Sequence, residues 1–237
     1  MSFFGSTVVG HRGAKGLAPE NSRKAFEVAL SHGLKWVETD IRQTADGHLI
    51  LHHDALICDM PISRHTLGEL NDWLEQQGLE PLMGLNELLE EFAHLLQLNL
   101  ELKDPACLPP LIKEIERRDL WQTTLISSFY HPIVVEAAAA YPKGKFAPLI
   151  ACRPLDAKRF MRDFPLCRYV VCDHDFIDEN WVSELVKLGI TCWLYNVHHP
   201  ESAQEAISWG VGGIIVDRPD YFGHELANQS SINREMR

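Results

Sequence analysis

Polar residues suited to metal binding and proton transfer follow several apolar stretches in the first half of the chain. In chain order they are His11 and Arg12, Glu38 and Asp40, His53 and Asp54, and Glu101 and Lys103. Carboxylates that meet at one place form a hard oxygen site for Mg²⁺ or Ca²⁺. Imidazoles titrate near neutrality and suit general acid and base catalysis. The pattern is typical of a metal-assisted phosphoryl-transfer site.

The spacing and charges of these residues support that chemistry. Glu38 and Asp40 are two positions apart, so a strand places both carboxylates on one face; Glu101 and Lys103 have the same spacing. Without a cation, the three carboxylates would repel one another and one would tend to hold a proton. With a divalent cation, Arg12 and Lys103 leave one excess positive charge, which a singly charged phosphodiester would neutralise.

Apolar stretches that read as buried parallel strands alternate with helical patterns along the chain. The predicted strands are Thr7–Gly10, Trp36–Ile41, Leu96–Glu101, Thr124–Phe129, Phe146–Ile150, Tyr169–Asp173, Thr191–Asn196 and Gly213–Val216. This alternation predicts an α/β fold, a closed TIM (β/α)8 barrel, with a doubly wound open sheet as the alternative. The active site of such a barrel lies at the C-terminal ends of its strands. The fold would therefore gather the polar residues.

One segment interrupts the alternation between the second and third predicted strands. Residues 45–48 read Ala-Asp-Gly-His and predict a hairpin turn, with Leu49–His52 as the returning strand. We expect residues 55–95 to form a small irregular and helical insertion. It would include an amphipathic helix over Leu85–Leu96.

Composition limits the class of protein. The chain has 237 residues, is 46% hydrophobic and carries a formal net charge of −11. We expect one barrel domain over residues 1–237, with a frayed polar tail over 227–237. The acidic balance argues against nucleic-acid binding, and the short apolar runs argue against stable membrane insertion. The N-terminus resembles no signal peptide, and no cysteines form a CxxC pair, so we expect a cytoplasmic protein with reduced thiols. We expect its partner to be a small-molecule substrate. The sequence does not predict an oligomeric state.

Taken together, the motifs resemble those of the glycerophosphodiester phosphodiesterase family, bacterial cytoplasmic type, from about Thr7 to Pro219. The matching segments are His11-Arg12-Gly13, Pro19-Glu20-Asn21-Ser22, Glu38-Thr39-Asp40, Asp46-Gly47, His53-Asp54, Glu101-Leu102-Lys103, Trp193-Leu194-Tyr195-Asn196 and Val216-Asp217-Arg218-Pro219. Ser22 and Val216 replace a usual Thr. Residues 55–59 read Ala-Leu-Ile-Cys-Asp instead of the common Arg-Thr-x-x-Gly run. That departure leaves substrate preference open.

The resemblance implies hydrolysis of a glycerophosphodiester to sn-glycerol 3-phosphate and an alcohol. It assigns one divalent cation, Mg²⁺ or Ca²⁺, to Glu38, Asp40 and Glu101, and general acid and base roles to His11 and His53. It also implies phosphate contacts from Arg12 and Lys103, and contacts to the glycerol from Phe129 and Trp193. Which histidine is the acid, which alcohol is released, and whether water or the glycerol 2-hydroxyl attacks stay open.

Other functions are possible on the same barrel. A lysophospholipase D or phospholipase-like enzyme would need an apolar surface near the site. Leu67, Leu70, Trp73 and Leu74 could supply one, although their helical spacing favours packing. A non-catalytic glycerol-phosphate-binding barrel is disfavoured because no ligand or histidine is missing. An amidohydrolase-type barrel would want His-x-His where His11-Arg12-Gly13 stands.

Overall fold

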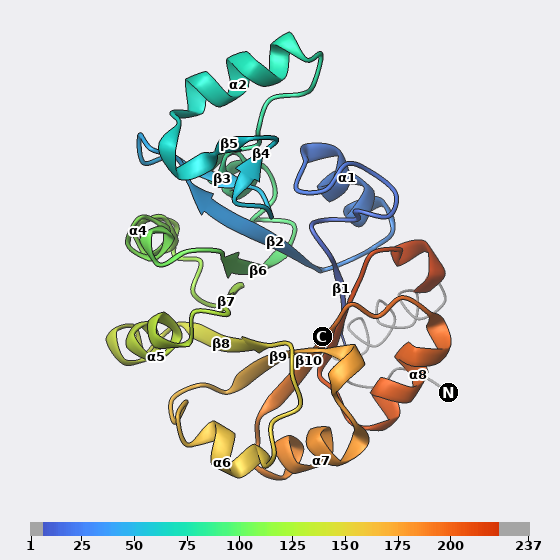
Figure 1. The fold of residues 1–237 in the computed structure, drawn as a ribbon. Coiled ribbons are helices and arrows are strands. Elements are labelled where there is room, and N and C mark those ends of the chain that lie inside the picture. The colour runs from blue at the N-terminus through green and yellow to red at the C-terminus, as the bar shows by residue number, and fades with distance from the viewer. Residues whose placement is uncertain (1–6, 223–237) are drawn as a thin grey trace.

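Eight parallel strands within the described residues, 7–222, close into a barrel in this computed structural model (Figure 1). The barrel strands are β1 Thr7–Gly10, β2 Trp36–Gln43, β6 Gln97–Leu102, β7 Thr124–Ser128, β8 Lys145–Ile150, β9 Tyr169–Asp173, β10 Thr191–Tyr195 and β11 Gly213–Val216. Each pairs in parallel with its neighbours, and β1 pairs with both β2 and β11. That closure confirms the predicted (β/α)8 barrel and excludes an open sheet.

Two apolar layers hold the barrel together. The interior layer contains small and branched residues such as Val9, Ala147 and Val171. A larger layer lies between the strands and the surrounding helices. Those helices are α1 Arg23–Ser31, α3 Leu85–Glu91, α4 Leu108–Arg118, α5 His131–Ala140, α6 Ala157–Met161, α7 Glu179–Lys187 and α8 Pro200–Ser208. The strands read as continuous apolar runs because both of their faces are buried.

Helix α1 shows how the sequence defines an outer helix. The Ser22 side chain accepts a hydrogen bond from the backbone N–H of Ala25 and caps the N-terminus. Phe26 and Ala29 face inward and are fully buried, and burying a phenyl ring contributes roughly 1.5–3 kcal/mol. Gly33, with φ of 79°, ends the helix in a conformation that glycine adopts without strain.

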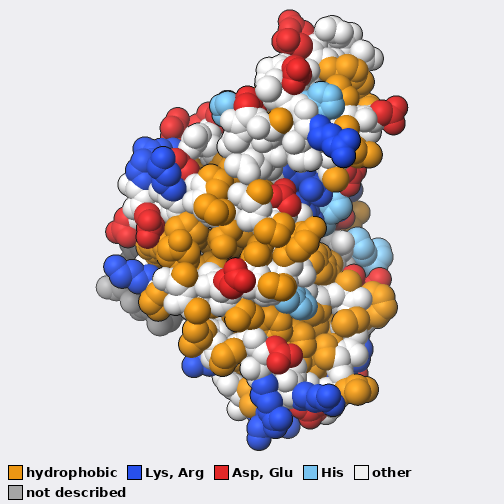
Figure 2. All heavy atoms as spheres, turned by 60° about the vertical axis from the view of Figure 1, so that its left-hand side comes forward, with side chains coloured by type: hydrophobic (Ala, Val, Ile, Leu, Met, Phe, Trp, Pro, Cys, Tyr) orange, Lys and Arg blue, Asp and Glu red, His pale blue; other side chains and the backbone are white. Residues whose placement is uncertain are grey.

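The insertion extends from the β2 end of the barrel. β2 pairs with the antiparallel strand β3 Leu49–Leu51, which confirms the predicted hairpin. The short strands β4 Leu56–Ile57 and β5 Met60–Pro61 follow, then α2 Leu67–Gln76, which projects at the top of Figures 1 and 2. The segment has its own small core. On the face shown in Figure 2, basic side chains lie in separate groups among acidic and apolar ones.

Helix α3 corrects one sequence prediction. We expected a helix over Leu85–Leu96, but it ends at Glu91 because Phe92, with φ of −120°, leaves the helical conformation. The N–H of Leu96 then bonds the Phe92 carbonyl in a turn that leads into β6. Leu85 and Leu88 are buried in the large apolar layer, so this part of 55–95 belongs to the ring of barrel helices.

The tail predicted over 227–237 lies outside the described residues. Within 7–222, no helix has the length and apolar character that a membrane span requires. All six cysteines are free thiols.

Candidate active site

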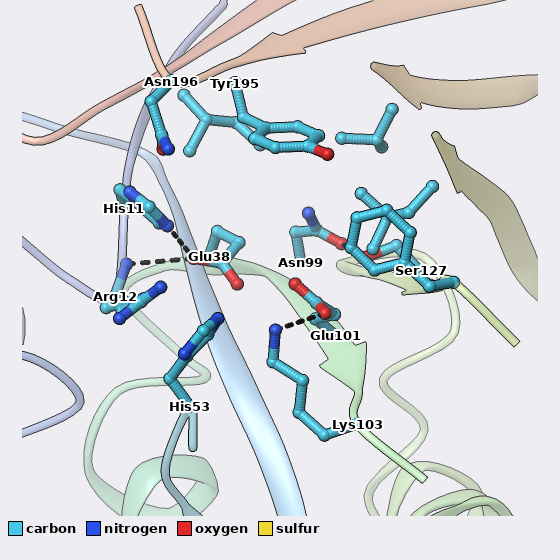
Figure 3. A pocket seen from close by; sticks show the side chains of 14 residues that line it. His11, Arg12, Glu38, His53, Asn99, Glu101, Lys103, Ser127, Tyr195 and Asn196 are labelled. Atoms are coloured by element: carbon cyan, nitrogen blue, oxygen red, sulfur yellow. Dashed lines mark hydrogen bonds and ion pairs between the residues drawn. The ribbon is translucent and has the colours of Figure 1, made fainter. Parts of the chain in front are cut away.

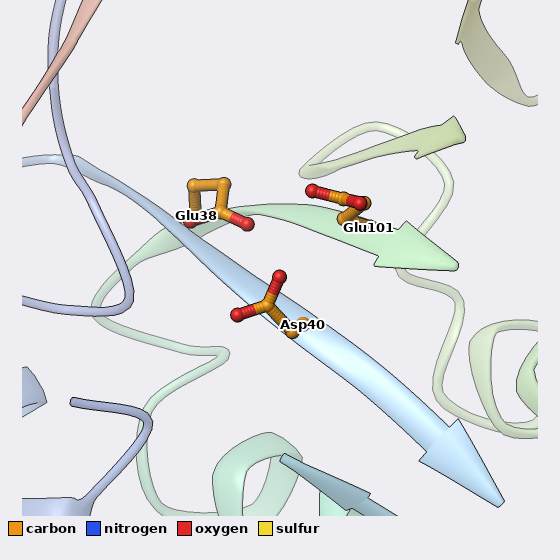
Figure 4. Close-up of side chains that lie close together, drawn as sticks. All are labelled: Glu38, Asp40 and Glu101. Carbon is orange, nitrogen blue, oxygen red and sulfur yellow. The ribbon is translucent and has the colours of Figure 1, made fainter. Parts of the chain in front are cut away.

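Three carboxylates from β2 and β6 meet inside the C-terminal end of the barrel (Figure 4). Glu38 and Asp40 share one face of β2, and the strand register places Asp40 beside Glu101 on β6. Each offers a carboxylate oxygen within 4.8 Å of the others. Asp40 is 1% exposed and Glu38 is 4% exposed. A buried, all-oxygen cluster of this size fits a hard divalent cation.

Burial and mutual repulsion set the charges of the cluster. Burial, together with Asp40 and Glu101, raises the pKa of Glu38 well above its usual value. Burial also raises the pKa of Glu101. Burial acts in the same direction on Asp40, but Lys103 and Arg12 overcome it and hold the pKa of Asp40 below its usual value. The Oε1 atom of Glu38 is buried without a hydrogen-bond partner in the described residues. An unpaired, buried carboxylate oxygen is what a cation site requires.

Two basic side chains contact the carboxylates. Lys103 Nζ lies 3.0 Å from Asp40 Oδ1 and also pairs with Glu101. Arg12 Nε lies 3.2 Å from Asp40 Oδ2, while its Nη1 donates to both oxygens of Glu20 at 2.7 and 2.8 Å. The positively charged groups of Lys103 and Arg12 therefore lie beside the carboxylate cluster. There they could contact a phosphate bound to a metal ion held by the cluster.

The backbone after β1 turns sharply to bring Arg12 to this position. Arg12 has a positive φ of 48° and Gly13 one of 85°. A Cβ on Gly13 would lie 2.7 Å from the Cβ of Ala25, so only glycine fits. The same turn directs the Arg12 N–H to Glu38 Oε2 at 3.0 Å. The His-Arg-Gly motif thus contributes the side chains of His11 and Arg12 to the site. Its backbone also binds Glu38, a candidate metal ligand.

His11 is buried and held by a carboxylate from the last strand of the barrel. Its Nδ1 lies 2.7 Å from Asp217 Oδ1, and its Nε2 lies 3.7 Å from Glu38 Oε2. Burial lowers the pKa of His11, although the bond to Asp217 opposes that shift. A carboxylate can only accept, so Nδ1 carries the proton and Nε2 keeps a free lone pair. The ring therefore presents a base toward the carboxylate cluster.

His53 approaches the site from the hairpin beside β2. Its Nδ1 lies 2.8 Å from Asp54 Oδ1, and its side chain is 39% exposed. Its backbone carbonyl accepts from Arg42 Nε at 2.9 Å and Nη2 at 2.6 Å. Arg42 therefore fixes the backbone that carries this histidine.

Asn21, which the sequence showed only as part of the Pro19-Glu20-Asn21-Ser22 motif, contacts the carboxylate cluster. Its Nδ2 donates to Asp40 Oδ2 at 2.9 Å, and its Oδ1 accepts from the Thr39 hydroxyl at 2.7 Å. Ser22 takes the capping role instead. The available signal was that only one of two adjacent residues can cap a helix, which leaves the other free for a different contact.

A cavity of about 200 Å³ opens over these groups (Figure 3). Among the predicted site residues, those that line it are His11, Arg12, Glu38, His53, Glu101, Lys103 and Phe129. Asp40 lies in the buried cluster beside it. Further polar lining comes from Asn99, Ser127, Tyr195 and Asn196, and the apolar lining from Leu149, Val171 and Ile215.

Trp193 is the predicted substrate-contact residue that the structure does not place at the cavity. It is 4% exposed and belongs to the interior apolar layer. Its ring packs against Trp36 at 5.0 Å and Tyr169 at 6.4 Å between ring centroids, both at the opposite end of their strands from the site. Tyr195, two residues later on the same face of β10, lines the cavity instead.

Known proteins with the same architecture and sequence pattern are glycerophosphodiester phosphodiesterases. The model of the glycerophosphoryl diester phosphodiesterase family matches residues 11–103, which include both histidines and all three carboxylates. A glycerophosphodiester phosphodiesterase of Caldanaerobacter subterraneus subsp. tengcongensis is 29% identical over 90% of this chain and 94% of its own. The matched family model and this relative support the glycerophosphoryl diester phosphodiesterase family for this chain.

A second relative is similar in sequence, and two solved structures share the fold. A glycerophosphodiester phosphodiesterase of Bacillus altitudinis is 26% identical over 90% of this chain and 95% of its own. A phosphodiesterase structure from Oleispira antarctica, in complex with the product sn-glycerol-3-phosphate, has a TM-score of 0.81 at 24% identity, covering 98% of this chain and 100% of that one. A structure from Parabacteroides distasonis has a TM-score of 0.82 at 24% identity, covering 95% and 98%. The predicted enzyme class, a phosphodiesterase, is confirmed at the level of the family.

Proposed function

We propose that this protein hydrolyses glycerophosphodiesters to sn-glycerol 3-phosphate and a free alcohol, using one divalent cation and two histidines. The observation that carries the proposal is the buried Glu38, Asp40 and Glu101 cluster at a cavity lined by His11 and His53. The related phosphodiesterase of Oleispira antarctica, whose structure holds sn-glycerol-3-phosphate, supports the same product here.

Glu38, Asp40 and Glu101 would hold the cation, as their all-oxygen donor set and the unpaired Glu38 Oε1 support. A bound Mg²⁺ or Ca²⁺ supplies Lewis-acid polarisation of a phosphate oxygen and orients the substrate. Both ions accept carboxylate ligands, so the donor set favours neither. Arg12 and Lys103 would share the remaining negative charge of the phosphate, with Arg12 able to contact two oxygens at once.

His11 is the proposed general base and His53 the proposed general acid. His11 is neutral at physiological pH, because burial lowers its pKa, and its free Nε2 faces the cluster. It would accept the proton of the nucleophile, either water or the glycerol 2-hydroxyl. His53, on the more exposed side, would donate its proton to the departing alkoxide. Trapping a 1,2-cyclic glycerophosphate would identify the hydroxyl as the nucleophile, and its absence under trapping conditions favours water.

Ester substrates with different leaving groups test these roles. A p-nitrophenolate leaves without protonation, whereas an alkoxide does not. We therefore expect His53→Ala to slow release of choline far more than release of p-nitrophenol from glycerol 3-phosphate esters. His11→Ala should slow both alike. Equal losses in the His53 variant would contradict the acid assignment.

Phe129 and Tyr195 are the aromatic residues proposed to flank the glycerol. Phe129 is 46% exposed at the cavity, and its ring lies 6.4 Å from that of Tyr195 between centroids. The two rings meet edge to face and give the cavity an apolar side. Trp193 supports this side from the barrel interior and has no proposed contact with substrate.

The lipid-substrate alternative loses the residues that favoured it. Leu70 and Leu74 are buried within the insertion, and Leu67 and Trp73 pack against the same small core. They therefore form no apolar surface beside the site. The binding-only alternative has no supporting observation either, because the complete set of acidic and imidazole groups is present and brought together.

The proposed reaction is tested by incubating the metal-loaded protein with glycerophosphocholine and glycerophosphoethanolamine. We expect sn-glycerol 3-phosphate and the free alcohol in equal amounts. Folded, metal-loaded protein that releases neither product would overturn the proposal.

A cytoplasmic location and a single barrel domain over 1–237 stay part of the proposal. The six free thiols support the cytoplasmic location.

A further inference from the structure

A second cavity, of about 310 Å³, adjoins the first. The two share one wall, made of His53, Glu101, Lys103 and Phe129. The rest of the second cavity is lined by Arg42, Asp54, Ala55, Leu102 and Tyr130. It therefore lies between the insertion and the loop that follows β7.

We propose that this second cavity is the subsite for the leaving alcohol, and that it takes an uncharged polyol such as glycerol or a ring polyol. The inference rests on the proposed function. A phosphodiester held at the carboxylate cluster has two ester substituents that point in different directions. Glu101 of the cluster and His53 border both cavities, so one substituent enters each. His53 on the shared wall then lies beside the bridging oxygen of the group in the second cavity.

The first cavity is the one that suits the glycerol phosphate moiety. It is the smaller of the two, at about 200 Å³, and His11 lines it but not the second cavity. The proposed base therefore serves the side where the nucleophile is activated. The second cavity is more open to solvent than the first, as an exit route for a released alcohol requires.

The charges around the second cavity favour an uncharged occupant. Arg42 and Asp54 balance each other, and Lys103 is already paired with Glu101. Arg42 lines the cavity beside its bonds to the His53 carbonyl, and the Asp54 side chain is 74% exposed. Hydroxyl groups can accept from the first and donate to the second. A quaternary ammonium group has no hydroxyl at its cationic end, so that end could neither accept from Arg42 nor donate to Asp54.

Two aromatic rings complete a surface suited to a polyol. Phe129 and Tyr130 are 46% and 48% exposed at the edge of the cavity. Ring faces of this kind pack against the C–H groups of a polyol while polar side chains bind its hydroxyls. The site therefore combines an apolar face with one donor and one acceptor.

Filling the cavity tests its role. Ala55 is an exposed residue of its lining, whereas neighbouring Leu56 lines neither cavity. Ala55→Phe should reduce kcat/KM for glycerophosphoglycerol, relative to that for the methyl ester of glycerol 3-phosphate, by about tenfold. Leu56→Phe, the matched control, should leave that ratio unchanged. Circular dichroism and thermal melting of both variants establish that they fold.

The wild-type protein tests the class of alcohol. We expect kcat/KM for glycerophosphoglycerol to exceed that for glycerophosphocholine by about tenfold. Equal loss on the glyceryl and methyl esters in Ala55→Phe would show that the second cavity does not hold the alcohol. Choline favoured over glycerol would overturn the polyol assignment. Failure of the wild-type protein to release sn-glycerol 3-phosphate from any ester would instead overturn the proposed function itself.

Discussion

The bond between His11 and Asp217 gives the sharpest prediction about the catalytic base. Asp217→Asn removes a carboxylate that lies 2.7 Å from the buried Nδ1 of His11. Hydrogen bonds to charged groups contribute about 1.5–3 kcal/mol, and each 1.36 kcal/mol is tenfold in rate, so kcat should fall by about 10- to 150-fold. Asp217 does not line the cavity, so KM should change little.

The pH dependence of the same variant provides a second readout. Burial lowers the pKa of His11 and Asp217 raises it, so removal of the carboxylate leaves burial less opposed. The acidic limb of the kcat/KM profile should therefore move to lower pH. Asp220→Asn is the matched control, because Asp220 pairs with Arg218 and lines neither described cavity beside the site. A wild-type kcat in Asp217→Asn, or a loss confined to KM, would refute the positioning role.

Three further predictions test the metal site and the interior of the barrel. Asn21→Ala removes the 2.9 Å bond to Asp40 and should weaken Mg²⁺ or Ca²⁺ affinity by about 10- to 100-fold, measured by titration calorimetry; unchanged affinity would show that Asp40 needs no such support. Because the pKa of Glu38 is raised, metal binding should release a proton, and affinity should increase with pH through that pKa. Calorimetry in buffers of different ionisation enthalpy measures this release, and its absence in mildly acidic buffer would contradict the raised pKa. Trp193→Phe should lower the free energy of unfolding by roughly 1–2 kcal/mol, because the smaller ring loses contacts with Trp36. The KM of this variant should stay near the wild-type value. A large rise in KM alone would restore Trp193 as a substrate contact.

The sequence was informative about the strands because their apolar runs are continuous and short. Seven helices surround eight strands among the described residues. The bounds of three strands match the prediction, and those of the other five differ by one or two residues. The error at the end of α3 has a local cause. The apolar pattern continues through Leu95 and Leu96, but there it belongs to a turn and the approach to β6. Periodicity alone does not distinguish these uses of leucine.

The site was less predictable where its geometry depends on depth and on distant contacts. Alternation identifies Trp193 and Tyr195 as sharing a face of β10, but not which of them reaches the cavity. The contact between His11 and Asp217 joins residues 206 positions apart. The bonds of Asn21 to Asp40 and of Arg42 to the His53 carbonyl join nearer segments, but they too depend on how the chain folds back on β2.

Metal dependence of the reaction is measured by adding back ions to protein from which metal has been stripped. Protein freed of metal by chelation, and shown to be folded, should release no sn-glycerol 3-phosphate from glycerophosphodiesters. Release should return on addition of Mg²⁺ or Ca²⁺ and should fail to return in Glu38→Gln. Undiminished release from protein shown to contain no metal would contradict the assignment of Glu38, Asp40 and Glu101 as a catalytic metal site.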